Sequence, residues 1–134
     1  LNLTHTRADM FRAVVEGIAA GTAHVLETYA EVGASPARVL AVGGGTKNTL
    51  WLQATSDLGQ VPQHVCETTI GASYGNAFLA ALAIGLVQPQ DILGWNPDAT
   101  TVRPDFVPAY VTQYPLWKRL YSQTRDIMQA MPPQ

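Results

Sequence analysis

Three consecutive glycines are the residues of this sequence whose spacing most clearly invites a ligand. Gly43, Gly44 and Gly45 lie between a stretch that predicts a strand and a stretch that predicts a helix. Glycine is entropically costly in a folded chain, so a triplet requires either a turn that other residues cannot adopt or the close approach of another group. Amides at a helix N-terminus point outward without partners, and the helix dipole adds partial positive charge there. A bound nucleotide is therefore one explanation, and a tight turn without a ligand is the other.

The spacing around the triplet matches neither common phosphate-binding pattern. Neither G-x-G-x-x-G nor G-x-x-x-x-G-K-[ST] fits Gly43, Gly44, Gly45 and Lys47. The triplet nevertheless follows a predicted strand, and ligands of open α/β sheets bind beyond the carboxyl ends of the strands. The triplet alone is thus a weak indication of a nucleotide site.

The other residue types that carry chemistry form no recognisable cluster in the sequence. His5, His24 and His64 are far apart and have no carboxylate at a partnering spacing, so we interpret them as surface or core residues. The single Cys66 lies in an apolar run and predicts a small buried hydrophobe. We interpret Asp57 as a solvated or capping residue on the helix after the glycines. No metal site is expected in this chain.

The elements that must position the glycines alternate between helix and strand. Strands are expected at residues 37–42 and 61–67, and helices at residues 4–33, 48–59, 71–85 and from about Pro115 onward. Thr6 and Asp9 predict a capping box at the start of the first helix, and Gly33 predicts its end. Residues 86–108 are rich in Pro and Asp and are expected to form an irregular loop.

Two apolar stripes predict where these helices are buried. On the first helix the stripe consists of Phe11, Val15, Ile18, Val25 and Tyr29, and a second face of small residues predicts close packing against a sheet or helix. On the last helix the predicted core stripe consists of Tyr114, Trp117, Tyr121, Thr124 and Met128.

The fold class that this order predicts is α/β with a parallel sheet. Two strands cannot cover three or four amphipathic helices, so we expect the chain to be the back portion of something larger and to self-associate through the exposed sheet. Apolar residues make up 47% and charged residues 13% of the sequence, and the net charge is −2. This balance argues against a nucleic-acid partner or a membrane surface, and we expect a cytoplasmic protein.

The sequence resembles FGGY-type carbohydrate kinases, most closely the xylulokinase-like members, in three blocks that stand in the order of that family: RADMFRAVVEGIA, GGGTKNTLWLQATSDLG and TTIGASYGNAFLAALAIG. The resemblance implies a ribonuclease H-like (actin-like ATPase) fold that is only partly present. Residues 1–134 would form the C-terminal portion of the second, nucleotide-side domain, and the first, sugar-binding domain is absent.

The resemblance also implies a nucleotide site at the glycines. The implied nucleotide-binding residues are Gly43, Gly44, Gly45, Thr46 and Asn48. In this arrangement Gly44 approaches the nucleotide through its backbone, and Asn48 contacts the adenine side. Asn48 is also a plausible helix cap. Lys47 would lie near the adenosine end, so we do not expect it to contact a phosphate.

The activity that the resemblance implies is transfer of the γ-phosphoryl group of ATP to a sugar hydroxyl, with Mg²⁺ as a cofactor and a pentulose such as xylulose as the favoured substrate. The catalytic base is expected on the missing first domain, so this chain would hold no catalytic residue and would be inactive alone. Two alternatives stay open. One is a module that binds nucleotide or a partner without catalysis, and the other is a structural piece in which the glycines form only a turn.

Overall fold

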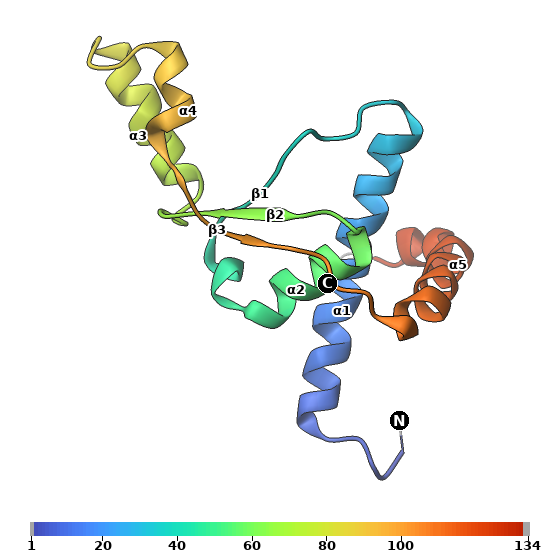
Figure 1. Ribbon diagram of the computed structural model, residues 1–134. Helices are drawn as coiled ribbons and strands as arrows, with labels where there is room; N and C mark the ends of the chain where they lie inside the picture. The colour runs from blue at the N-terminus through green and yellow to red at the C-terminus, as the bar shows by residue number, and fades with distance from the viewer. Residues whose placement is uncertain (1, 133–134) are drawn as a thin grey trace.

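The computed structural model describes residues 2–132 of the chain (Figure 1). Its elements follow in the order α1 (Arg7–Glu31), β1 (Val39–Ala41), the 3-10 turn η1 (Gly44–Lys47), α2 (Thr49–Gly59), β2 (Gln63–Cys66), α3 (Ala72–Ala83), the 3-10 turn η2 (Pro89–Asp91), α4 (Ile92–Trp95), β3 (Asp98–Val102) and α5 (Pro108–Ala130).

The sheet has three strands in the order β1-β2-β3, with β2 at its centre. β1 pairs with β2 in parallel, as the sequence predicts, and Leu40 lies opposite His64. β3 pairs with β2 in antiparallel fashion and places Thr101 on the other side of His64. The parallel pair brings the carboxyl ends of β1 and β2 to one edge of the sheet, which is where the glycine triplet begins.

Helix α1 begins with the predicted capping box and ends at the predicted glycine. The Thr6 amide donates to Asp9 Oδ2 at 2.7 Å, and Gly33 follows the helix with a φ of 73°. The prediction of its buried face is wrong for most of the stripe: Val15 is buried, but Phe11, Ile18, Val25 and Tyr29 are between 46% and 57% exposed. The buried face instead carries Val15, Ala19, Ala20 and Ala23.

The small residues of α1 are buried because α2 approaches them closely. A Cβ added at Gly59 would lie 3.2 Å from Cδ1 of Leu26 and 3.9 Å from Cα of Ala23. On its other side, α2 contacts the sheet, since Ser56 Oγ donates to the carbonyl of Val102 at 3.1 Å. Helix α2 therefore links α1 to the sheet whose first strand, β1, leads into the glycine triplet.

Helices α3 and α4 form a hairpin that projects from the sheet, as Figure 1 shows at its upper left. The hairpin is closed by aromatic packing: the rings of Phe78 and Trp95 have centroids 5.2 Å apart and meet edge to face. Two hydrogen bonds join the same helices, from Trp95 Nε1 to the carbonyl of Tyr74 at 3.3 Å and from Tyr74 Oη to the carbonyl of Trp95 at 3.1 Å.

The prediction of an irregular loop over residues 86–108 is wrong, because this segment holds η2, α4 and β3. The Pro and Asp residues of this segment are typical of loops, so the sequence does not predict the strand. The strand forms because Thr100, Thr101 and Val102 are β-branched and pair with β2 along the chain from Val65 back to Gln63.

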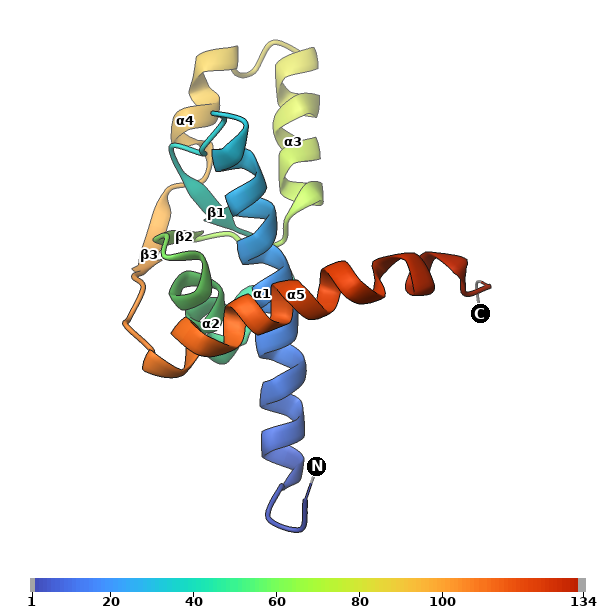
Figure 2. The ribbon, with the colours of Figure 1, turned by 90° about the vertical axis from the view of Figure 1, so that its right-hand side faces the viewer.

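The last helix, α5, begins at Pro108 and not near Pro115, which lies inside it. Pro108 occupies the first turn, where its missing N–H removes no hydrogen bond. The predicted core stripe is wrong: α5 has no buried residue among those described, and Tyr121 and Met128 are 46% and 64% exposed. In Figure 2, α5 crosses α1 and its C-terminal half extends away from the other elements.

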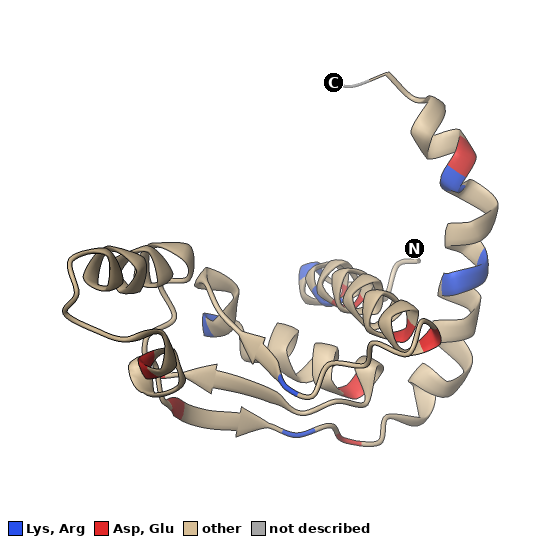
Figure 3. Cartoon of the chain, turned by 90° about the horizontal axis from the view of Figure 1, so that it is seen from above, with Lys and Arg blue, Asp and Glu red and all other residues tan. Residues whose placement is uncertain are grey.

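Polar contacts join α5 to α1 where the two helices cross. Lys118 Nζ lies 3.0 Å from Glu27 Oε2, and Tyr110 Oη donates to Glu16 Oε1 at 2.8 Å. The charged residues are distributed along the whole chain and do not cluster in one element (Figure 3). Within residues 2–132, no helix is both long and apolar enough to cross a membrane.

Candidate functional site

The glycine triplet forms a tight turn from β1 into η1. Gly43 has φ 89° and ψ −177°, a conformation that is almost exclusive to glycine. Its amide donates to the carbonyl of Thr69 at 2.8 Å, and its own carbonyl accepts the hydroxyl of Thr46 at 2.7 Å. The turn is therefore held by backbone bonds on one side and by a threonine side chain on the other.

Asn48 caps the helix that follows the turn. Its Oδ1 accepts the amide of Trp51 at 3.1 Å, and its own amide donates to the carbonyl of Gly45 at 3.0 Å. The capping role that the sequence suggests is thus confirmed. The half-buried side chain of Asn48 makes no hydrogen bond through Nδ2 to the described residues.

Different constraints exclude a side chain at two of the three glycines. Gly43 requires its positive φ, and Gly45 lies against the indole of Trp51, where an added Cβ would come within 2.9 Å of Cζ3. Gly44 has neither constraint: its φ is not in the left-handed region, and an added Cβ would meet nothing within 4 Å. The backbone at Gly44 therefore faces open space that a side chain would occupy.

A second glycine turn lies beside the first. Gly71, with φ 79°, precedes α3, and a Cβ added there would lie 3.8 Å from Cα of Gly43. The ends of β1 and β2 thus bring Gly43 and Gly71, which belong to two different sequence blocks, into backbone contact. The N-termini of α2 and α3 both follow these turns, so their outward amides lie at the same edge of the sheet.

A pocket of about 280 Å³ lies beneath the turn, on the side of α1 and α2. Its lining includes Thr22, Leu40, Thr46, Trp51 and Gln63. Its volume is close to the lower end of the range for small-molecule sites. Gly45 and Trp51 both line this pocket, and the Trp51 ring lies against Gly45.

The interpretation of Asp57 as a solvated or capping residue is wrong. The residue is only 7% exposed, and its Oδ1 accepts Nε2 of Gln53 at 2.7 Å and the amide of Asp105 at 2.8 Å. It therefore ties α2 to the segment between β3 and α5. The sequence could not show this because Asp105 lies 48 residues away.

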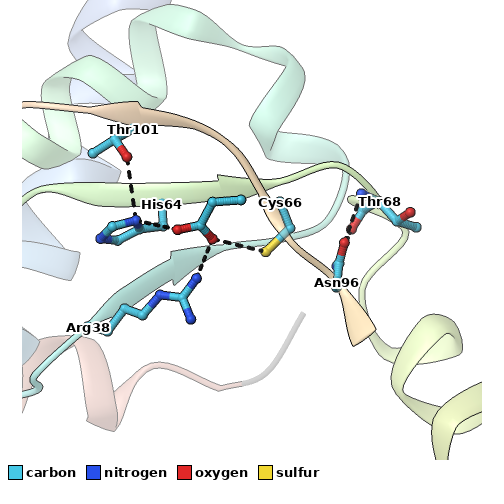
Figure 4. Close-up of polar contacts among 7 residues, drawn as sticks. Arg38, His64, Cys66, Thr68, Asn96 and Thr101 are labelled. Carbon is cyan, nitrogen blue, oxygen red and sulfur yellow. Dashed lines mark hydrogen bonds and ion pairs between the residues drawn. The ribbon is translucent and has the colours of Figure 1, made fainter. Parts of the chain in front are cut away.

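His64 does have a carboxylate partner, contrary to the reading of the histidines from sequence. Its Nδ1 lies 2.7 Å from Oδ2 of Asp98, and Arg38 forms an ion pair with Oδ1 of the same carboxylate (Figure 4). Burial raises the pKa of Asp98, but the hydrogen bond with His64 and the positive charge of Arg38 outweigh it and leave the pKa below its usual value of 3.8.

This charged cluster joins the three strands at positions away from the glycine turn. Cys66, which is buried as predicted, places its Sγ 3.8 Å from Oδ1 of Asp98. Across the described part of the chain, no three His, Cys, Asp or Glu side chains are arranged to hold a metal ion. The ion pairs of Asp98 connect β3 to β2 through His64 and to the residue before β1 through Arg38.

The structure brings the five predicted nucleotide-binding residues together in one turn, and their contacts with a nucleotide stay a prediction. It also adds residues of or near the segment after β2 that the sequence did not single out: Thr69, whose carbonyl accepts the amide of Gly43, and Asn96, which is hydrogen-bonded to the neighbouring Thr68. Lys47 is exposed at the outer side of the turn.

Comparison with known proteins gives consistent relatives. The C-terminal domain of the FGGY family of carbohydrate kinases matches residues 1–84. Xylulose kinase of Bacillus subtilis (strain 168) is 29% identical over 136 aligned residues, which cover 95% of this chain and 26% of that protein. Glycerol kinase of Dechloromonas aromatica (strain RCB) is 36% identical over 96 residues, covering 69% of this chain and 19% of that protein.

Solved structures agree over nearly the whole chain. A xylulose kinase from Brucella ovis superposes with a TM-score of 0.77 at 29% identity, covering 95% of this chain and 27% of that one. A xylulose kinase from Rhodospirillum rubrum gives a TM-score of 0.75 at 27% identity, covering 96% and 27%. The chain thus spans about a quarter of the length of these relatives. The predicted fold class, a partial actin-like ATPase domain, is confirmed.

Proposed function

Since this chain belongs to the FGGY family of carbohydrate kinases, we propose that it forms the adenosine-binding side of the cleft in a kinase that transfers the γ-phosphoryl group of ATP to a sugar hydroxyl. The observation that carries this proposal is the open space at Gly44. Gly44 is exposed and directly follows Gly43, which meets the Gly71 turn at the edge of the sheet, so a nucleotide has room to lie against the backbone there.

The surroundings of Gly44 suit the adenosine part of a nucleotide. Asn48 keeps its Oδ1 for the helix cap and offers Nδ2 as a donor, which suits a ring nitrogen of adenine. Gly43 and Gly71 bring two backbone turns together without side chains, so that a flat base can approach the edge of the sheet. The hydroxyl of Thr46 donates to Gly43, so we assign Thr46 to the turn itself and only its outer face to the ligand.

The chemistry of phosphoryl transfer needs groups beyond this turn. A base must accept the proton of the sugar hydroxyl, and Mg²⁺ must neutralise the phosphates. We assign both the base and the Mg²⁺ ligands to the part of the kinase outside residues 1–134. What this chain contributes is binding and orientation, so that the γ-phosphoryl group is held at the sugar.

For the substrate we propose a pentulose, with xylulose favoured. The support is that xylulose kinases are among the relatives that match over 95% of the chain or more. Glycerol kinases also match, over 69% of the chain in sequence and over 100% of it in structure. Sugar selectivity would reside outside this chain, because the glycine turn offers no group that reads a sugar.

A second candidate is a module that associates with a partner or with itself through the β1 edge of the sheet. Leu40 and Val42 are 47% and 55% exposed there, and unpaired edge strands readily pair with other chains. This candidate predicts a dimer whose sedimentation is indifferent to ATP. The kinase proposal predicts adenine nucleotide binding at the glycine turn.

The experiment that tests the kinase proposal is calorimetric titration of ADP into the natural polypeptide that carries residues 1–134, as wild type and as Asn48→Ser. Serine keeps the helix cap but cannot donate to adenine as the asparagine amide does. We expect the Kd for ADP to rise about tenfold, equivalent to about 1.4 kcal/mol. Equal affinities for the two proteins would contradict the role of Asn48, and no binding to the wild type would contradict the proposal.

A further inference from the structure

We propose that Asn96 is a positioning residue for the glycine turn, although it lies some 50 residues beyond the turn and outside the family match at residues 1–84. The inference rests on the proposed nucleotide site for its functional consequence. Its structural part, that Asn96 fixes the conformation of the turn, can be tested without any nucleotide.

The first step is that the Asn96 side chain is hydrogen-bonded to the segment that follows β2. The amide of Thr68 donates to Oδ1 of Asn96 at 3.0 Å, and Nδ2 of Asn96 donates to the carbonyl of Thr68 at 2.8 Å (Figure 4). The ladder between β2 and β3 ends at Cys66 and Asp98. Beyond that point, one asparagine side chain makes both hydrogen bonds that a neighbouring strand would otherwise make.

The backbone beside Asn96 reinforces the same segment. The amide of Glu67 donates to the carbonyl of Pro97 at 3.0 Å. Residues 67 and 68 are thus bound at three points by residues 96 and 97. Only asparagine or glutamine can both donate and accept through one side-chain amide, so aspartate or alanine at this position would leave at least one Thr68 group without its partner.

The second step connects this segment to the glycine turn. Thr69, next to Thr68, accepts the amide of Gly43 at 2.8 Å, and Gly71 lies against Gly43. This hydrogen bond, donated by the backbone amide of Gly43, joins the start of the glycine turn to the segment that follows β2. If the segment 67–71 moves, Gly43 loses this partner and the turn that follows it loses its fixed position.

The third step is that Asn96 also sets where the α3–α4 hairpin leaves the sheet. Its neighbour Trp95 exchanges two hydrogen bonds with Tyr74 at the base of α3. The hairpin enters through residues 69–71 and returns through residues 95–97. Asn96 holds these two connections together and thereby holds α3 beside the glycine turn.

The test measures hydrogen exchange in peptides covering residues 40–48 and 67–71 of the natural polypeptide, without nucleotide, in the wild type, Asn96→Ala and Asn96→Asp. Asn76→Ala is the matched control, because Asn76 is exposed on α3 and has no hydrogen-bond partner among the described residues. Tyr110→Phe is a second control that weakens the distant contact between α5 and α1. The Kd for ADP is then measured for the same five proteins.

The inference predicts faster exchange in both peptides for the two Asn96 variants, and an ADP Kd at least fivefold higher than in either control, at a temperature where urea titration shows every variant folded. Unchanged exchange of the 40–48 peptide in Asn96→Ala would overturn it, whatever the result with ADP. Faster exchange together with an ADP Kd equal to that of the Tyr110→Phe control would also overturn it, because Asn96 would then be a structural residue only. If the wild type binds no ADP while exchange responds as predicted, the positioning of the turn is upheld and the proposed function fails.

Discussion

Gly45 lies directly against the indole ring of Trp51. A Cβ at Gly45 would come within 2.9 Å of Cζ3 and 3.2 Å of Cε3 of this ring, closer than side-chain atoms ordinarily approach. Trp51 is also the residue whose amide Asn48 caps, so the same tryptophan supports the turn through its ring and begins α2 through its backbone. The position of the glycine turn therefore depends on how Trp51 packs.

Gly45→Ala should destabilise the fold by about 1–3 kcal/mol, because the added methyl group must displace the Trp51 ring from its position against the turn. Urea unfolding followed by circular dichroism measures the loss. In the double variant Gly45→Ala with Trp51→Leu, the clash is absent. The unfolding free energy that the double variant loses should therefore be smaller than the sum of the losses in the two single variants. Strict additivity in this double-mutant cycle would show that Gly45 and Trp51 do not interact as the structure places them.

Asp57→Ala should cost about 1–3 kcal/mol of unfolding free energy, since the Asp105 amide and the Gln53 side chain both lose a buried acceptor. Asp57→Asn provides the comparison, because its Oδ1 can accept both hydrogen bonds. We expect the asparagine variant to lose less than the alanine variant in the same urea titration. Equal stability of wild type and Asp57→Ala would mean that the carboxylate does not hold α2 to the start of α5.

The Asp98 carboxylate should make stability depend on pH in the acidic range. Its pKa in the folded chain is below the ordinary value of 3.8, so the folded state favours the charged form. The stability it contributes is present above pH 3.8 and is lost as the pH falls through the folded pKa. The difference in urea midpoint between wild type and Asp98→Asn should therefore shrink as the pH is lowered from 6 toward 2.

Asp126→Asn is the control for Asp98, because the Asp126 side chain is 84% exposed at the end of α5. The difference in urea midpoint between Asp126→Asn and the wild type should stay small throughout the same pH range. If the difference in urea midpoint between the wild type and Asp98→Asn stayed constant down to pH 2, this would contradict the ion pairs of Asp98 with Arg38 and His64.

Tyr110 should make stability depend on pH in the alkaline range. Burial and the hydrogen bond that Tyr110 donates to Glu16 together raise the pKa of Tyr110 to about 12, against the opposing effect of Arg12. A raised pKa means that the stability is present below about pH 10, the unfolded value, and is lost as the pH rises through about 12. The difference in unfolding free energy between wild type and Tyr110→Phe should fall over this interval. A difference that grows between pH 10 and 12 would contradict the hydrogen bond to Glu16.

The sequence predicts the features whose signals lie within a few residues of one another. Thr6 and Asp9 are three residues apart, as are Asn48 and Trp51, and both caps form as expected. The parallel pairing of β1 and β2 was also predictable, because short apolar runs separated by a helix favour it.

The features that the sequence does not predict depend on partners far along the chain. His64 and Asp98 are 34 residues apart, and Asp57 lies 48 residues from Asp105. Strand β3 was missed because Pro97 and Asp98 at its start are typical of loops, whereas pairing with β2 decides its conformation. The apolar stripes on α1 and α5 predict buried faces. Among the described residues, however, the buried part of α1 is the face of Val15, Ala19, Ala20 and Ala23, and α5 has no buried residue.

The central claim is that a nucleotide lies against the backbone at Gly44, and a graded series at this position tests it most directly. In Gly44→Ala and Gly44→Leu the new side chain enters space that the chain leaves open, so the unfolding free energy should change by less than about 0.5 kcal/mol. We predict that the Kd for ADP, measured by calorimetric titration of the natural polypeptide, rises about tenfold for alanine and further for leucine. An ADP affinity of Gly44→Leu equal to that of the wild type would show that the nucleotide does not approach this turn.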